Sequence, residues 1–169
     1  MSGATLVSVG EYLVTCYRPD RDYVDGQLLE RNVGEWEHSR PQIVLGSFFL
    51  QHEKALGLLS VTEQSIQVSE HRYRVPDISV IRGKAEKIIT RPPFLCIEIL
   101  SPEDSMSSMH ERIDDYLVFG VENIWILDPV RQKAFWVDAN GMHQADNSIL
   151  ETSGAPIRVD LNTFWPQST

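Results

Sequence analysis

The sequence is organised around one apolar stretch between prolines, Pro92-Pro93-Phe94-Leu95-Cys96-Ile97-Glu98-Ile99-Leu100-Ser101-Pro102. A short, unbroken apolar run of this kind predicts a β-strand that is buried on both faces of a sheet. Glu98 lies in the middle of the run. An unpaired buried carboxylate is costly, so Glu98 requires a proton, a cationic side chain or a metal ion as its partner.

Length and composition place the chain among ordinary globular proteins. Its 169 residues predict one domain over residues 1–169, with room for a core. No apolar stretch is long enough to span a membrane, and the N-terminus lacks a basic and apolar cleavable signal. We therefore expect a cytoplasmic protein without a membrane partner.

The charge is acidic overall but unevenly distributed. A net charge of -9 argues against nonspecific nucleic-acid binding over the whole surface. Residues 71–91 nevertheless contain a basic strip of Arg72, Arg74, Arg82, Lys84, Lys87 and Arg91. This strip could follow a phosphate backbone, or it could be a solvated strand edge with charged loops.

Local patterns predict both helices and strands. Helices are expected over residues 8–17, from near Ser39 with Pro41 in the first turn to Gly57, and from a cap at Ser107 or Ser108 to Phe119. Strands are expected over 23–29 around an Asp25-Gly26 turn, 58–61, 65–68, 73–82, the Glu98 stretch, 124–127 and 133–137. Residues 83–91 and 138–154 are expected to be loops, and 157–165 a short strand or turn. The fold class is therefore α/β in the broad sense, an α+β arrangement of a mixed sheet flanked by helices.

Two carboxylates could carry chemistry. Asp77 follows Pro76 at the start of one predicted strand, and Glu98 lies in the next strand. If these strands pair, both carboxylates can face one end of the sheet, where they repel each other unless a divalent cation lies between them. Mg²⁺ suits such a site, because it takes a few carboxylates, keeps several waters and activates water for attack on a phosphate. Arg112 is the only arginine or lysine between Arg91 and Arg131, and it could bind that phosphate.

These residues also carry a family resemblance. The chain resembles the Uma-two family, restriction-endonuclease-like proteins of the PD-(D/E)xK nuclease superfamily, from the Asp25-Gly26 hairpin through His38 to Pro129. The matching motifs are Pro76-Asp77, residues 93–102, Arg112 with Tyr116, Gly120-Val121 and residues 125–129.

The resemblance implies a restriction-endonuclease-like core and cleavage of DNA phosphodiesters with Mg²⁺, or with Mn²⁺ in its place. It implies Asp77, Glu98 and the carbonyl of Ile99 as metal ligands, with Arg112 positioning phosphate and His38 assisting. A homodimer is a further implication of the family analogy.

Leu100 stands, as generally in this family, where many nucleases of the superfamily have a lysine. The chain departs from the family itself at two positions, with Arg112 where the family usually has a lysine and Ser108 where an aspartate is usual. Since arginine stays protonated, Arg112 is expected to act electrostatically and not as a general base.

Other interpretations remain open for the same residues. Glu98 could be a buried structural partner of Arg112, Asp77 could cap a turn or pair with Arg74, and His38 could be a solvated or capping residue. The alternative function is a catalytically degenerate nuclease-fold module that binds nucleic acid or a protein partner. A hydrolase acting on a non-nucleic phosphoester is a third reading.

Overall fold

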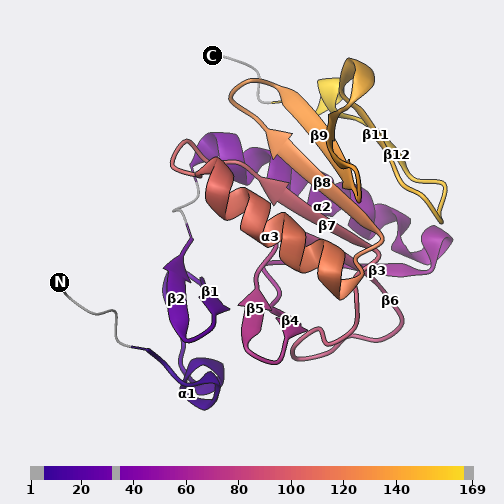
Figure 1. Ribbon diagram of the computed structural model, residues 1–169. Helices are drawn as coiled ribbons and strands as arrows, with labels where there is room; N and C mark the ends of the chain where they lie inside the picture. Colours follow the sequence, from indigo (N-terminus) through magenta and orange to yellow (C-terminus); the bar gives the residue numbers. More distant parts are fainter. Residues whose placement is uncertain (1–5, 32–34, 166–169) are drawn as a thin grey trace.

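The computed structural model describes residues 6–31 and 35–165 (Figure 1). The helices are α1 (Val9–Val14), α2 (Trp36–Leu56) and α3 (Met106–Phe119), with 3-10 turns η1 (Asp146–Ser148) and η2 (Leu161–Thr163). The first six strands are β1 (Arg21–Val24), β2 (Gln27–Glu30), β3 (Leu58–Thr62), β4 (Ile66–Ser69), β5 (Arg72–Arg74) and β6 (Ile78–Arg82). The remaining strands are β7 (Leu95–Ile99), β8 (Asn123–Asp128), β9 (Lys133–Asp138), β10 (Gly141–Gln144), β11 (Ile149–Glu151) and β12 (Arg158–Asp160).

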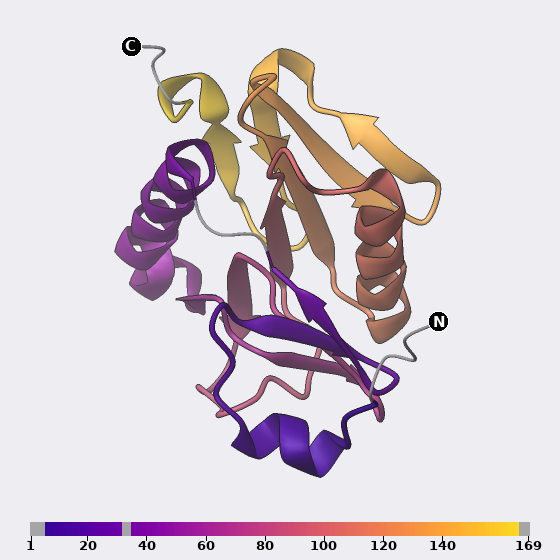
Figure 2. The same ribbon diagram turned by 90° about the vertical axis from the view of Figure 1, so that its left-hand side faces the viewer.

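A mixed six-stranded sheet forms the centre of the molecule. Its strand order is β10-β9-β8-β7-β6-β3, and all neighbours are antiparallel except β7 and β8, which α3 connects as a parallel pair. Helices α2 and α3 lie against opposite faces of this sheet, as Figure 2 shows. The predicted fold class, a mixed sheet flanked by helices, is confirmed.

The Glu98 stretch forms the buried strand β7, and its alternating side chains enter two different cores. Ile97 packs in the cluster that contains Phe49 of α2, whereas Cys96 packs in the cluster that contains Met109 of α3. Because successive side chains of a strand point to opposite faces, Glu98 shares the α3 face with Cys96. The charge in the apolar run is thereby directed toward α3.

A second, smaller sheet packs beneath one end of the first (Figure 2). Its order is β2-β1-β5-β4, and its β1–β2 hairpin has the predicted Asp25-Gly26 turn. The predicted single strand over 73–82 is wrong, because β5 belongs to this sheet and β6 to the central one. The chain crosses between the sheets at Val75-Pro76-Asp77, where proline has no N–H for a ladder hydrogen bond. Asp77 therefore lies where the two sheets meet.

Helix α1 ends at Val14, three residues before the predicted end at residue 17, whereas α2 and α3 differ from prediction at their N-termini. Helix α2 begins at Trp36, so Pro41 is inside the helix and not in its first turn. Helix α3 is capped by Ser105, whose hydroxyl accepts a hydrogen bond from the N–H of Ser108 at 3.1 Å, earlier than the predicted cap at Ser107 or Ser108. The C-termini at Gly57 and Gly120 are confirmed, and both glycines adopt the left-handed conformation that favours this residue.

The predicted loop over 138–154 is also wrong, since it contains β10, η1 and β11. Strand β10 is an edge strand, and β11 pairs only with β12 among the described strands. These strands are short and lack the long apolar run that marks a central strand. Leu150 of β11 and Val159 of β12 nevertheless pack in the hydrophobic core. None of the helices in the described part of the chain combines the length and apolarity that a bilayer crossing requires.

Candidate functional site

A cleft of about 620 Å³ opens where the two sheets meet α2 and α3. Four of the predicted site residues, His38, Asp77, Ile99 and Arg112, line it. Arg31, which directly follows β2, lines it as well. Residues far apart in sequence thus converge on one concave surface, which is the usual form of a ligand site.

Asp77 is held by three donors. Its Oδ2 accepts a hydrogen bond from the N–H of Ile99 at 2.7 Å, and its Oδ1 lies 2.5 Å from Nη2 of Arg31 and 3.2 Å from Nε2 of His38. Burial opposes ionisation of this carboxyl group, which is 2% exposed, but His38, Arg31 and the Ile99 amide outweigh burial and lower its pKa. Asp77 is therefore an anion at neutral pH.

Glu98 is buried, like Asp77, but it does not line the cleft. Its side chain is 1% exposed, Oε2 lies 2.7 Å from Nη1 of Arg112, and the hydroxyl of Tyr116 donates to Oε1 at 2.5 Å. Burial raises the pKa of Glu98, Arg112 opposes that rise, and the negative charge of Asp77 adds to it. The pKa values of the two carboxyl groups are thus displaced in opposite directions.

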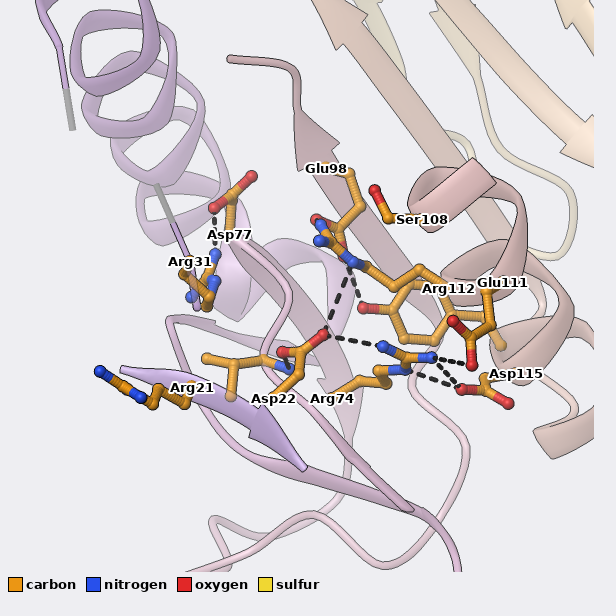
Figure 3. A network of polar contacts seen from close by, with 12 residues as sticks. Arg21, Asp22, Arg31, Arg74, Asp77, Glu98, Ser108, Glu111, Arg112 and Asp115 are labelled. Atoms are coloured by element: carbon orange, nitrogen blue, oxygen red, sulfur yellow. Dashed lines mark hydrogen bonds and ion pairs between the residues drawn. The ribbon is translucent and has the colours of Figure 1, made fainter. Parts of the chain in front are cut away.

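The predicted convergence of the two carboxylates is met in part. Ile78 pairs with Ile97 across β6 and β7, and the same antiparallel register, continued by one residue, places Asp77 opposite Glu98. Each carboxylate nevertheless turns to its own guanidinium, Asp77 to Arg31 and Glu98 to Arg112, as Figure 3 shows. The buried pair between Glu98 and Arg112, one of the alternatives from sequence, is present.

A second alternative, a pair between Asp77 and Arg74, is not formed. Arg74 is 1% exposed and contacts Asp22 of β1 at 3.1 Å and Asp115 of α3 at 2.7 Å. Asp22 in turn accepts from the N–H of Val75 at 3.1 Å and lies 3.6 Å from Nε of Arg112. This alternating network of acids and arginines connects the small sheet to α3 (Figure 3).

Arg31 and Asp22 are the site residues that sequence reasoning missed. Arg31 reaches its partner Asp77 across 46 residues, and Asp22 reaches Arg74 across 52. Neither has a local pattern that marks it. The available signal was indirect: a buried carboxylate beside Pro76 needs a cation, and Arg31 follows the predicted hairpin.

His38 and Ser108 have different surroundings. His38 lies in the first turn of α2 beside Asp77, and although burial disfavours its charged form, the hydrogen bond and charge of Asp77 raise its pKa. Ser108 donates its hydroxyl proton to the carbonyl of Ser105 at 2.9 Å, within the first turn of α3. Ser108 therefore serves the end of its own helix.

The donor types at the site fit a hard divalent cation, which prefers carboxylate and carbonyl oxygens. Asp77 and Ile99 line the cleft, and the Asp77 carboxylate and the Ile99 carbonyl are oxygens of this kind. The repulsion between Asp77 and Glu98 favours a cation near both. Within residues 6–31 and 35–165, no group of three or more histidine, cysteine, aspartate and glutamate side chains is arranged to hold a metal. A metal would therefore rely on two carboxylates and a carbonyl, and it would compete with Arg31 and Arg112 for their oxygens.

Comparisons with known proteins agree with this fold. The model of the Uma2 family, described as "Putative restriction endonuclease", matches residues 10–161. A crystal structure from Anabaena variabilis ATCC 29413, titled as a putative nuclease belonging to DUF820, superposes with a TM-score of 0.83. The alignment covers 94% of this chain and 97% of that one at 20% sequence identity, which supports the fold alone. No curated protein matches the chain.

Proposed function

The chain belongs to the Uma2 family of restriction-endonuclease-like proteins, and we propose that it hydrolyses DNA phosphodiester bonds with a divalent metal ion. Family and fold both point to a restriction-endonuclease-like nuclease. The observation that carries the finer proposal is the register of β6 and β7, which brings Asp77, directly before β6, next to Glu98 of β7, with Asp77 lining the cleft and Glu98 buried behind it. Their opposite pKa displacements are typical of paired carboxyl groups at functional sites.

In this proposal Asp77, Glu98 and the carbonyl of Ile99 would hold Mg²⁺ or Mn²⁺. A divalent cation at such a site activates water for attack and stabilises charge on the phosphoryl oxygens. The pKa of Asp77 is lowered and its side chain lines the cleft, so it would be the principal ligand. Glu98 would contribute when its carboxylate is shared between Arg112 and the cation.

The surrounding side chains bind phosphate and move protons. Arg112 lines the cleft, and the charge of Glu98 raises its pKa further, so it binds phosphate as a permanent cation and is not a base. His38 has a raised pKa and lies at the cleft, which makes it the candidate proton donor to the leaving oxygen.

Cleavage of plasmid and oligonucleotide DNA in Mg²⁺, Mn²⁺ or a chelator tests this function. Wild type should cut only with metal, and Glu98→Gln should lose most of the activity while remaining folded. Glu122→Gln, which alters an exposed acid paired with Arg82, should cut like wild type. Equal cutting by wild type and Glu98→Gln would show that the assignment is wrong.

One observation favours a second function, a catalytically degenerate module that binds nucleic acid or protein. Glu98 is already neutralised by Arg112 and bonded to Tyr116, so it has both oxygens occupied without a metal. If calorimetry detects no Mg²⁺ or Mn²⁺ binding and no substrate is cut, this second function is preferred.

Three further expectations remain proposals. We propose that residues 1–169 act as one domain and that the chain works as a cytoplasmic homodimer, by analogy with restriction-like enzymes. Sedimentation velocity over a range of protein concentrations tests the dimer, and a single cooperative unfolding transition would support one domain.

A further inference from the structure

The cleft has too few unpaired arginine or lysine side chains to bind the phosphates of a continuous duplex. Its lining includes the carboxylates of Asp20, Glu30, Glu63, Asp77 and Asp104 and the guanidinium groups of Arg18, Arg31 and Arg112. Arg31 is engaged by Asp77, and Arg112 by Glu98. Among the described residues that line the cleft, Arg18 is the one arginine without a carboxylate partner. A bound divalent cation would offset part of the acidity without making the lining basic.

The basic strip at residues 71–91 does not supply the missing charge, because none of its arginines or lysines lines the cleft. Its four arginines pair with carboxylates: Arg72 with Asp25 and Asp115, Arg74 with Asp22 and Asp115, Arg82 with Glu122, and Arg91 with Glu86. Its two lysines, Lys84 and Lys87, line other hollows of the surface. The sequence outside the described residues contains no lysine or arginine. Proteins that bind duplex DNA neutralise several phosphates, often about six to ten.

An aromatic side chain at the cleft points to a different substrate form. Tyr17 lines the cleft together with Arg18. Its ring stacks on that of the buried Tyr12, with 5.8 Å between centroids and 21° between planes, and the guanidinium group of Arg21 lies over it, 5.9 Å from the ring centroid. An aromatic ring next to a free cation is the arrangement with which proteins hold unpaired bases and their phosphates. In a duplex the base faces are covered by their neighbours, so they cannot stack on Tyr17.

We propose that the cleft takes an unpaired segment of a polynucleotide, a single strand or a frayed end, and not a continuous duplex. A base stacks on the ring of Tyr17, where it displaces the guanidinium group of Arg21, and Arg18 contacts an adjoining phosphate. This inference rests on the proposed nuclease function for its reaction, but the binding itself can be measured separately. A cleft of about 620 Å³ is of small-ligand size and suits one or two nucleotides.

The test is fluorescence anisotropy with labelled oligonucleotides of one sequence, presented as single-stranded DNA, single-stranded RNA and duplex DNA, without divalent metal. We expect a single strand to bind about tenfold more tightly than the duplex, as one stacked base allows. With no more than about two to three phosphate contacts, log K should fall with log salt at a slope of about −2 or shallower. Whichever of single-stranded DNA and single-stranded RNA binds more tightly is the polymer that the cleft prefers.

Matched variants locate the stacking residue. Tyr17→Ala should weaken single-strand binding about tenfold and leave duplex binding unchanged, whereas Tyr17→Phe keeps the ring and should bind like wild type. Arg18→Ala is a second variant on the exposed side of the cleft, and it should reduce the salt slope by about 0.7. Circular dichroism confirms that each variant is folded.

Three outcomes would overturn the inference: equal or tighter binding of the duplex, a salt slope of about −5 or steeper, or no binding of either single strand. A wrong nuclease assignment would give a different set of results from a wrong binding inference. If single strands bind as expected but no substrate is cut with Mg²⁺ or Mn²⁺, the activity is wrong and the binding inference stands. If the duplex is cut and single strands are not, the activity stands and the inference fails.

Discussion

The guanidinium group of Arg112 lies between two buried carboxylates, 2.7 Å from Oε2 of Glu98 through Nη1 and 3.6 Å from Oδ2 of Asp22 through Nε. Glu98 belongs to the central sheet and Asp22 to the small one, so one side chain of α3 joins both sheets. Arg112 is therefore a structural residue as well as the candidate phosphate ligand.

Replacing Arg112 with alanine should destabilise the protein strongly. The change leaves Glu98 buried without its cation, a loss that typically costs about 3–5 kcal/mol. Arg112→Lys should recover much of the stability, because it keeps a charge near Glu98. Denaturant unfolding measures the difference, with Arg158→Ala as the control, since the exposed pair of Arg158 and Glu151 should contribute less than about 1 kcal/mol. Similar losses in the Arg112→Ala and Arg158→Ala variants would contradict the structural role of Arg112.

The hydroxyl of Tyr116 should contribute more to stability than an ordinary tyrosine hydroxyl. It donates to the buried carboxylate of Glu98 at 2.5 Å, whereas the hydroxyl of Tyr23 donates to a neutral carbonyl, that of Val7, at 3.0 Å. Tyr116→Phe should therefore cost about 2 kcal/mol and Tyr23→Phe about 1 kcal/mol in the free energy of unfolding. A larger cost for Tyr23→Phe would argue against a charged Glu98.

Asp22 should prove important for stability although it lies outside the predicted site. It is buried, accepts from the N–H of Val75 and contacts both Arg74 and Arg112. Asp22→Asn removes the charge that these arginines share and should cost about 3 kcal/mol. Asp25→Asn in the same hairpin removes a more exposed partner of Arg72 and should cost less than about 1 kcal/mol. Thermal unfolding of the two variants side by side distinguishes the two positions.

The contact between His38 and Asp77 should make stability depend on pH. The pKa of His38 is raised, so its contribution is complete below its ordinary value of 6.5 and is lost as the pH rises through the folded-state pKa. The pKa of Asp77 is lowered, so its contribution is present above its ordinary value of 3.8 and is lost as the pH falls through the folded-state pKa. Their mutual stabilisation is thus greatest between about pH 4 and 6.5.

Above this pH range, loss of the proton from His38 should weaken its contact with Asp77 and lower the stability of the protein. Between about pH 6 and 9, the free energy of unfolding should decrease more for wild type than for His38→Gln. His110→Gln, a change at an exposed histidine of α3, should follow wild type. Parallel curves for wild type and His38→Gln would show that the contact does not stabilise the fold.

The parts of the fold that sequence predicted are those encoded by local patterns. The apolar run around Glu98, the Asp25-Gly26 turn and the glycine ends of α2 and α3 each depend on a few neighbouring residues. The prediction of one strand over residues 73–82 is wrong because the strand-like pattern continues through Pro76, whereas the chain passes from one sheet to the other there. Proline within a strand pattern was the available warning.

At the site, sequence indicated which charges need partners but not always which partners they find. Arg112 could be identified because it follows Glu98 on the next helix and has no cationic neighbour nearby in sequence. Arg31 and Asp22 could not, because their contacts form only when the hairpin packs against the central sheet. Long-range ion pairs depend on how elements pack, and local periodicity does not contain that information.

The central claim, that Asp77 and Glu98 share one divalent cation, is tested most directly by Mn²⁺ binding, measured as loss of the free-ion paramagnetic resonance signal. We predict one bound Mn²⁺ per wild-type chain and none in Asp77→Asn. Arg31→Gln should bind Mn²⁺ more tightly than wild type, since Arg31 competes for the same oxygen. Absence of binding by wild type, or unchanged binding in Asp77→Asn, would contradict the claim.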